Sequence, residues 1–125
     1  MRTWPGALRE RAAAAGCQAP DMFWRASEAA LGAVYNGIGP EEWPPFLREL
    51  LSRNLNRLEP AALIHDFEYV FAKPDYIGFT AANWRLAING IRLSTGWRGR
   101  AVALLLGVLC QVFGRRAFIG AHKIE

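Results

Sequence analysis

The 125-residue chain contains only two cysteines, Cys17 and Cys110. Two thiols form at most one disulfide, which excludes the small secreted domains that several disulfides hold together, so the fold depends on a hydrophobic core. The length fits a single domain, residues 1–125. A zinc site built from the two cysteines, His65 and His122 is disfavoured, because their spacing lacks the C-x-x-C and H-x-x-x-H patterns of such sites.

Long apolar segments are also absent. Residues 1–16 carry three arginines and lack the apolar centre of a signal peptide, which favours cytoplasmic synthesis. The longest apolar run, 101–109, falls short of the ~20 residues that cross a bilayer, even when it is extended to Phe113. We therefore expect no transmembrane segment. We also expect the apolar C-terminal helix over 97–113 to be buried, because it lacks the polar face of an interfacial helix.

The excess of positive charge is small, since 15 basic and 11 acidic residues give a net charge of +4. The arginines are scattered singly or in pairs, such as Arg98 with Arg100 and Arg115 with Arg116. Nucleic-acid-binding surfaces instead gather basic residues in one stripe, often with stacking aromatics. This distribution disfavours nucleic acid as a partner, and an anionic lipid surface explains the same charge equally well.

The pattern of apolar residues predicts helices and no strands, because no segment alternates with period two. Apolar spacing predicts a helix over 21–34 that begins at Asp21, a short helix over about 44–51, and a helix over 61–72 with Pro60 in its first turn. Two more helices are expected, one from Thr80 to about residue 93 and one over 97–113. The predicted fold class is all-α, a small helical domain.

Two segments between and within these helices carry unusual chemistry. The loop Tyr35-Asn36-Gly37-Ile38-Gly39-Pro40 holds two glycines and a proline within six residues, and carbonyl oxygens of such a turn, with one carboxylate, are ligands that calcium prefers. In the helix His65-Asp66-Phe67-Glu68-Tyr69, the first and last residues share a face, while Asp66 projects about 100° away. One face could offer a base and the next a metal ligand. A buried, hydrogen-bonded polar pair is the alternative interpretation.

These motifs resemble the phospholipase A2 superfamily. Segment 35–40 is similar to its calcium loop Y-x-G-x-G, and segment 65–69 to its H-D-x-x-Y active-site helix. Segment Phe79-Thr80-Ala81-Ala82-Asn83-Trp84-Arg85-Leu86 resembles the second helix of the phage and parvoviral branches, roughly F-x-x-A-D-x-x-F. The resemblance covers about residues 34–93 in the family's order. It implies two antiparallel active-site helices and a Gly-rich calcium-type loop within one domain.

The resemblance also implies a calcium site. Asp66 would be the bidentate ligand, and the backbone carbonyls of Tyr35, Gly37 and Gly39 would supply the other protein ligands. The Gly37 amide, together with Ca²⁺, would stabilise the developing oxyanion.

The implied catalytic residues lie on the two helices. His65 would be the general base that takes a proton from the attacking water, and its ordinary pKa of about 6.5 suits that task. Tyr69 would hold the hydrogen-bond network. Asn83 stands where the family has an aspartate paired with the histidine, and its oxygen can still accept the imidazole N–H.

The implied function is calcium-dependent hydrolysis of a phospholipid acyl ester, with a phospholipid or membrane surface as the partner. Such a chain would be peripheral to a membrane or associated with a virion. Asn83 leaves a second interpretation open, because an amide lacks the charge that stabilises imidazolium. In that interpretation the chain is a non-catalytic lipid-binding or phage-type structural protein that retains the phospholipase A2 scaffold.

Overall fold

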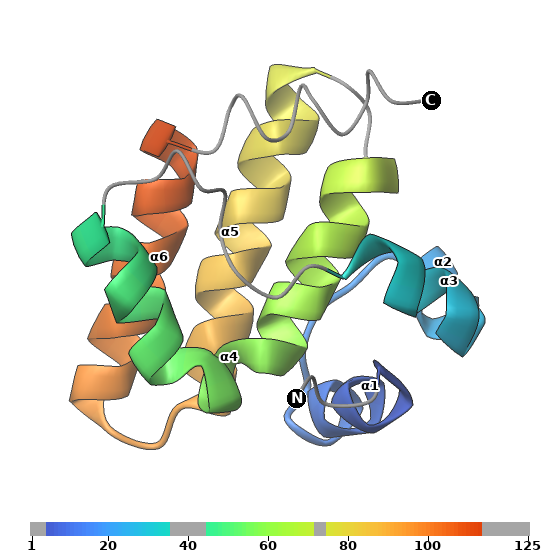
Figure 1. Ribbon diagram of the computed structural model, residues 1–125, viewed down its shortest axis with the longest axis horizontal. Coiled ribbons are helices and arrows are strands. Elements are labelled where there is room, and N and C mark those ends of the chain that lie inside the picture. The colour runs from blue at the N-terminus through green and yellow to red at the C-terminus, as the bar shows by residue number, and fades with distance from the viewer. Residues whose placement is uncertain (1–4, 36–44, 72–74, 114–125) are drawn as a thin grey trace.

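The computed structural model describes residues 5–35, 45–71 and 75–113, and these residues form helices joined by short links, without a strand (Figure 1). The helices are α1 (Pro5–Ala14), α2 (Asp21–Arg25), α3 (Glu28–Val34), α4 (Pro45–Phe71), α5 (Tyr76–Leu93) and α6 (Trp97–Phe113). The predicted all-α class is confirmed for this part of the chain. None of these helices has both the length and the hydropathy needed to span a bilayer.

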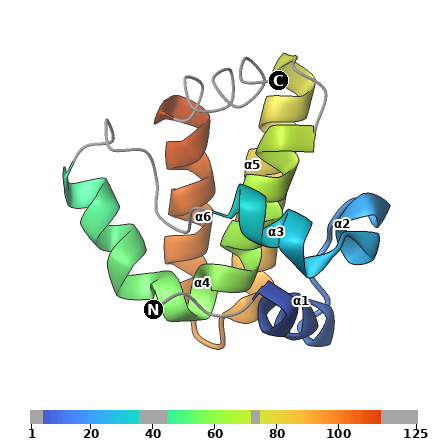
Figure 2. The same ribbon diagram turned by 45° about the vertical axis from the view of Figure 1, so that its right-hand side comes forward.

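The first three helices lie together on one side of α4 (Figure 2). The prediction of a single helix over 21–34 is wrong, because the chain turns between α2 and α3. Ala26 has an extended ψ of 147°, and the Ser27 side chain caps α3 by accepting a hydrogen bond from the N–H of Ala30 at 3.1 Å. A serine N-cap satisfies one of the free N–H groups at a helix start, and here it outweighs the apolar spacing across the turn.

Helix α4 bends sharply near its middle, where Pro60 lies (Figure 1). The sequence predicted two separate helices, but the structure has one helix of 27 residues that passes through this proline. Proline has no N–H for the carbonyl four residues earlier, and its ring pushes that carbonyl aside, which kinks the helix. That carbonyl belongs to Asn56 and accepts a hydrogen bond from Arg11 Nη2 at 2.9 Å. Helix α1 thus supplies the donor that Pro60 lacks.

Helix α5 begins at Tyr76, four residues before the predicted cap at Thr80. Asp75 is the true cap, because its Oδ1 accepts a hydrogen bond from the N–H of Gly78 at 2.7 Å. Helix α5 then packs closely against α6. A Cβ atom added at Gly107 would lie 2.7 Å from the Cβ of Ala87, so this contact requires glycine.

The expectation that the helix over 97–113 is buried is wrong for half of its surface. One stripe, Ala103, Leu106, Gly107 and Cys110, is buried against the neighbouring helices. Leu104, Leu105, Val108 and Val112 on the other side are exposed. An apolar composition alone could not tell a helix with one covered side from a helix covered all round.

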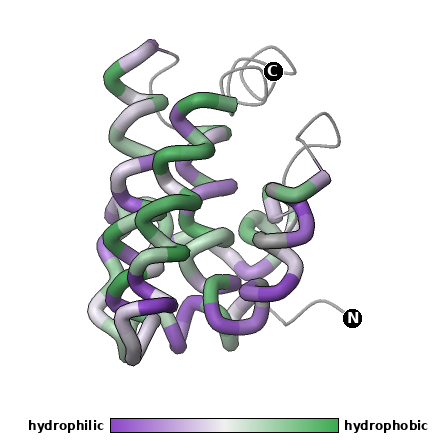
Figure 3. Tube along the Cα trace, turned by 90° about the vertical axis from the view of Figure 1, so that its left-hand side faces the viewer, coloured by the Kyte–Doolittle hydropathy of each residue, from purple (hydrophilic) through white to green (hydrophobic). Residues whose placement is uncertain are grey.

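The second half of α4 forms part of two hydrophobic clusters. One cluster joins it to α1, α2 and α3 and includes Leu8, Phe23, Leu31, Leu63 and Phe67. The other joins it to α5 and α6 and includes Leu58, Ala61, Leu86, Leu106 and Cys110. Hydrophobic residues recur from turn to turn along the long helices (Figure 3). The second half of α4 is therefore the central element of the fold.

Asn89 on α5 holds the link between α1 and α2 in place. Its side chain is fully buried, donates from Nδ2 to the carbonyl of Gln18 at 2.8 Å and accepts at Oδ1 from the N–H of Gln18 at 2.7 Å. Both polar ends of the buried amide are thus satisfied by one backbone residue. The link between α1 and α2 is held directly against α5.

Candidate functional site

The structure brings His65, Tyr69 and Asn83 into direct contact. His65 and Tyr69 lie on successive turns of α4, with ring centroids 4.1 Å apart. Asn83 reaches them from α5: its Oδ1 lies 2.9 Å from His65 Nε2 and accepts a hydrogen bond from the Tyr69 hydroxyl, also at 2.9 Å. All three side chains are buried, with at most 8% of their surface exposed.

The amide of Asn83 determines which nitrogen of His65 carries the proton. A carbonyl oxygen only accepts, so the 2.9 Å contact is a hydrogen bond when Nε2 holds the hydrogen. The orientation of the amide follows from its other end, where Nδ2 donates to Gln111 Oε1 at 2.8 Å. A neutral His65 therefore has its lone pair on Nδ1, the nitrogen that faces away from Asn83.

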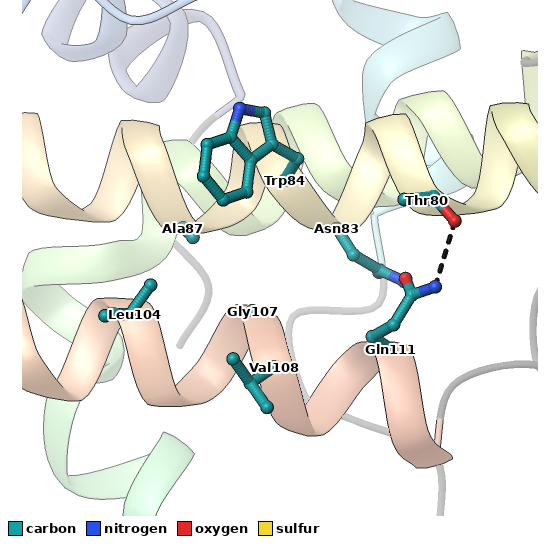
Figure 4. Close-up of a pocket in the computed structure, with 8 residues that line it drawn as sticks. All are labelled: Thr80, Asn83, Trp84, Ala87, Leu104, Gly107, Val108 and Gln111. Atoms are coloured by element: carbon teal, nitrogen blue, oxygen red, sulfur yellow. Dashed lines mark hydrogen bonds between the residues drawn. The ribbon is translucent and has the colours of Figure 1, made fainter.

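Gln111 on α6 extends this network toward Thr80 of α5 (Figure 4). Its Nε2 donates to Thr80 Oγ1 at 2.9 Å and to the Tyr76 hydroxyl at 3.1 Å. Both polar ends of the Gln111 amide are thereby used. Gln111 is not among the predicted site residues, although a single polar side chain beside the apolar run of α6 is a usable signal for a hydrogen bond between helices.

Burial controls the protonation of the site. It lowers the pKa of His65 to about 4, although the hydrogen bond to Asn83 acts in the opposite direction. Burial also raises the pKa of the Tyr69 hydroxyl. Both side chains are therefore neutral at neutral pH, and the site contains an uncharged base held by an uncharged amide.

Of the predicted calcium ligands, Tyr35 and Asp66 lie within the described residues, whereas Gly37 and Gly39 lie outside them. Tyr35 ends α3, and its hydroxyl donates to Glu59 Oε2 at 2.9 Å, which ties the start of the loop to α4. Asp66 lies on that same helix, next to His65, and is partly exposed. Carbonyl and carboxylate oxygens are the hard ligands that calcium takes, so the predicted donor set fits this ion chemically.

Cysteine and histidine do not form a metal site in the described part of the chain, where no group of three or more His, Cys, Asp or Glu side chains is arranged to hold an ion. Cys17 and Cys110 are free and buried. Burial raises the pKa of the Cys17 thiol to about 11, although Arg92 lowers it, and burial raises the pKa of Cys110 as well. Neither thiol is therefore a reactive thiolate at neutral pH.

A second polar pair lies about one turn after His65 on α4, where Glu68 contacts Arg85 of α5. Glu68 Oε2 accepts a hydrogen bond from Arg85 Nη1 at 2.5 Å, and Glu68 is only 2% exposed. Burial raises the pKa of Glu68 to about 7, against the opposing effect of the Arg85 charge. Neither residue is among the predicted site residues, because their contact depends on how α4 and α5 are aligned.

Comparison of the chain with protein-family models, curated proteins and solved structures finds no match.

Proposed function

We propose that the chain is a calcium-dependent hydrolase of phospholipid acyl esters, similar in mechanism to the phospholipase A2 superfamily, with His65 as the general base. The observation that carries the proposal is the contact between His65 Nε2 and Asn83 Oδ1, at 2.9 Å. It leaves Nδ1 of a neutral imidazole as the proton acceptor. The order of the motifs in 35–40, 65–69 and 79–86 supports the proposal independently, and the second half of α4 with α5 would be the antiparallel active-site pair.

In this mechanism His65 Nδ1 removes a proton from water as the water oxygen attacks the ester carbonyl. The imidazolium then gives that proton to the departing alkoxide, which returns His65 to its neutral form. Throughout, Nε2–H stays bonded to Asn83 Oδ1, and the Tyr69 hydroxyl holds the same oxygen in place. The two donors to one amide oxygen fix the plane of the imidazole and therefore the direction of Nδ1.

Calcium would be held by the Asp66 carboxylate and the carbonyls of Tyr35, Gly37 and Gly39, and when bound it supplies positive charge near the ester oxygen. The Gly37 N–H would donate a hydrogen bond to the same oxygen. Preorganised donors of this kind are worth about 10²–10³ in rate for one hydrogen bond.

A second function is favoured by the amide at position 83. An uncharged partner does not stabilise the imidazolium, and the pKa of His65 at about 4 makes it a weak base. Loss of the carboxylate from a Ser-His-Asp triad costs about 10⁴ in turnover. A chain with this site could therefore serve as a non-catalytic lipid-binding or phage-type structural protein, and hydrolysis by the Asn83→Asp variant with none by the wild type would favour that assignment.

Calorimetric titration with calcium tests the metal site without reference to turnover. We expect the wild type to bind Ca²⁺ and the Asp66→Asn variant to lose the binding, because an amide removes the charge and one strong ligand. Asp75→Asn is the matched control, since Asp75 is an exposed carboxylate that caps α5 and asparagine preserves a cap. Absence of binding to the wild type, or equal binding to Asp66→Asn, would contradict the calcium-dependent mechanism.

A further inference from the structure

Helix α6 presents a continuous apolar stripe to solvent. Trp97, Leu104, Leu105, Val108 and Val112 are each at least 46% exposed, and they recur at the three- and four-residue spacing of one helix side. The buried stripe of the same helix lies on the other side, against α4 and α5. The exposed stripe therefore is not needed for the core, and its exposure costs the isolated molecule free energy.

Helix α5 continues this surface. Tyr76, Ile77 and Trp84 are each more than 60% exposed. Trp84 and Thr80 line a groove of about 180 Å³ together with Leu104 and Val108 of α6, so the exposed residues of the two helices meet at this groove (Figure 4). We use the name α5–α6 face for the exposed apolar residues of the two helices. They are Tyr76, Ile77 and Trp84 of α5 with Trp97, Leu104, Leu105, Val108 and Val112 of α6. Contiguous apolar surfaces of this kind mark interaction sites.

The charge of the surrounding sequence identifies the kind of partner. Residues 76–124 contain seven basic residues and no aspartate or glutamate, whereas ten of the eleven acidic residues lie within residues 1–75. Arg98 and Arg100 are exposed on the first turn of α6, and the Arg98 guanidinium lies over the Trp97 ring, 5.6 Å from its centroid. The nearest carboxylate in the sequence, Asp75, is engaged as the cap of α5.

We propose that the α5–α6 face docks on the surface of an anionic lipid bilayer. Apolar side chains would enter the boundary between headgroups and acyl chains, and the arginines beside them would contact the lipid phosphates. A second copy of the chain fits less well, because the α5–α6 face adjoins the exposed Arg98 and Arg100, and pairing two such faces would add positive charge to positive charge. The described helices are too short or too polar to span the bilayer, so the contact is with its surface.

This inference goes beyond the proposed hydrolase and does not depend on it. The test therefore uses binding alone, measured by flotation with lipid vesicles in EGTA, where no calcium-dependent turnover occurs. Vesicles of phosphatidylcholine with phosphatidylglycerol are compared with vesicles of phosphatidylcholine alone. We expect binding to the anionic vesicles that weakens as salt is added.

Substitutions on the face identify the docking residues. Leu105→Ser and Val108→Ser should each lower the partition coefficient between vesicles and water about tenfold. Each removes an aliphatic side chain that docking would bury in the lipid. Met22→Ser on α2 is the matched control, since Met22 is 60% exposed but lies outside the face. The Arg98→Gln/Arg100→Gln double variant should lose much of the preference for anionic vesicles.

Three results would overturn the proposal. The first is no binding to either kind of vesicle, and the second is equal binding by Leu105→Ser, Val108→Ser and Met22→Ser. The third is a dimeric wild type that Leu105→Ser converts to a monomer, which would identify a second copy as the occupant. Binding in EGTA together with no hydrolysis of the same vesicles in calcium would support the docking face and contradict the hydrolase, so the two proposals are tested separately.

Discussion

His65 and Asn83 are joined by a 2.9 Å contact between Nε2 and Oδ1, and this contact connects the two longest helices of the candidate site, α4 and α5. It holds the imidazole in one tautomer without giving it a charged partner. The same amide passes the connection on to α6 through Gln111. The chemistry of the site therefore depends on the residue at position 83 more than on any other.

Asn83→Asp should raise the pKa of His65 above its value of about 4, because a carboxylate favours the charged imidazolium. The network can accept the change. A rotated Gln111 amide would donate from Nε2 to the new carboxylate oxygen, and the hydroxyls of Thr80 and Tyr76 would donate to its Oε1 instead of accepting. Titration of the His65 ring signals by NMR measures the shift. An unchanged pKa in a folded variant would contradict the assigned orientation of the site.

The same substitution should increase the rate of phospholipid hydrolysis at least about tenfold, because the imidazolium formed in the transition state gains an opposite charge. Asn89→Asp is not a suitable control, since Asn89 holds the N-terminal segment. Asn56→Asp is better, because the Asn56 side chain is exposed on α4. A rate gain in both variants would mean that added negative charge, rather than its position, changes turnover.

Gln111→Leu should lower the free energy of unfolding by about 1–3 kcal/mol, because it leaves the buried Asn83 amide without its hydrogen-bond acceptor. Urea denaturation measures this loss. Val112→Ala, one residue along on the exposed side of α6, should change stability by less than about 0.5 kcal/mol. Equal effects of the two substitutions would show that the hydrogen bond to Asn83 contributes nothing to the fold.

Gly107→Ala should destabilise the protein by about 1–3 kcal/mol, because the new Cβ overpacks the α5–α6 contact. It would lie 2.7 Å from the Ala87 Cβ and 3.0 Å from the carbonyl oxygen of Asn83, so α5 must move. Gly96→Ala is the control, since no atom lies within 4 Å of a Cβ at that position. Thermal unfolding gives the melting temperature of each variant. Equal melting temperatures would contradict the close packing of α5 on α6.

Glu68 should make the folded protein less stable as pH rises from about 4.5 to about 7. Its pKa is raised from 4.5 to about 7 in the folded state, chiefly by burial, so in this window the folded chain binds more protons than the unfolded chain. Glu68→Gln removes this titration. Urea denaturation at pH 5 and pH 8 should show a smaller loss for the variant than for the wild type, and identical losses would exclude a raised pKa.

The sequence predicted well those features that depend on local chemistry. The all-α class followed from apolar spacing. The contact of His65 with Asn83 joins two helices, and it was expected only because their motifs resemble a known family. The bend at Pro60 was misjudged as a helix start, because nothing near it in the sequence shows that Arg11 satisfies the carbonyl of Asn56.

The other contacts that depend on how helices face one another belong to no motif and could not be predicted. In the sequence, Gln111 is one polar residue next to an apolar run. Its hydrogen bond with Asn83 exists only because α6 packs beside α5. The pairing of Glu68 with Arg85 spans 17 residues of sequence and two helices. The exposure of Leu104 and Val108 likewise depends on which side of α6 the rest of the chain covers.

The central claim, that His65 acts as a base on a phospholipid ester, is tested most directly by fatty acid release from anionic phospholipid vesicles. The assay compares the wild type with His65→Gln, which retains an N–H donor for Asn83 but has no basic nitrogen, in calcium and in EGTA. We expect release by the wild type in calcium only, and none by His65→Gln in either condition. Release that persists in His65→Gln or in EGTA, or no release by the wild type in calcium, would contradict the claim.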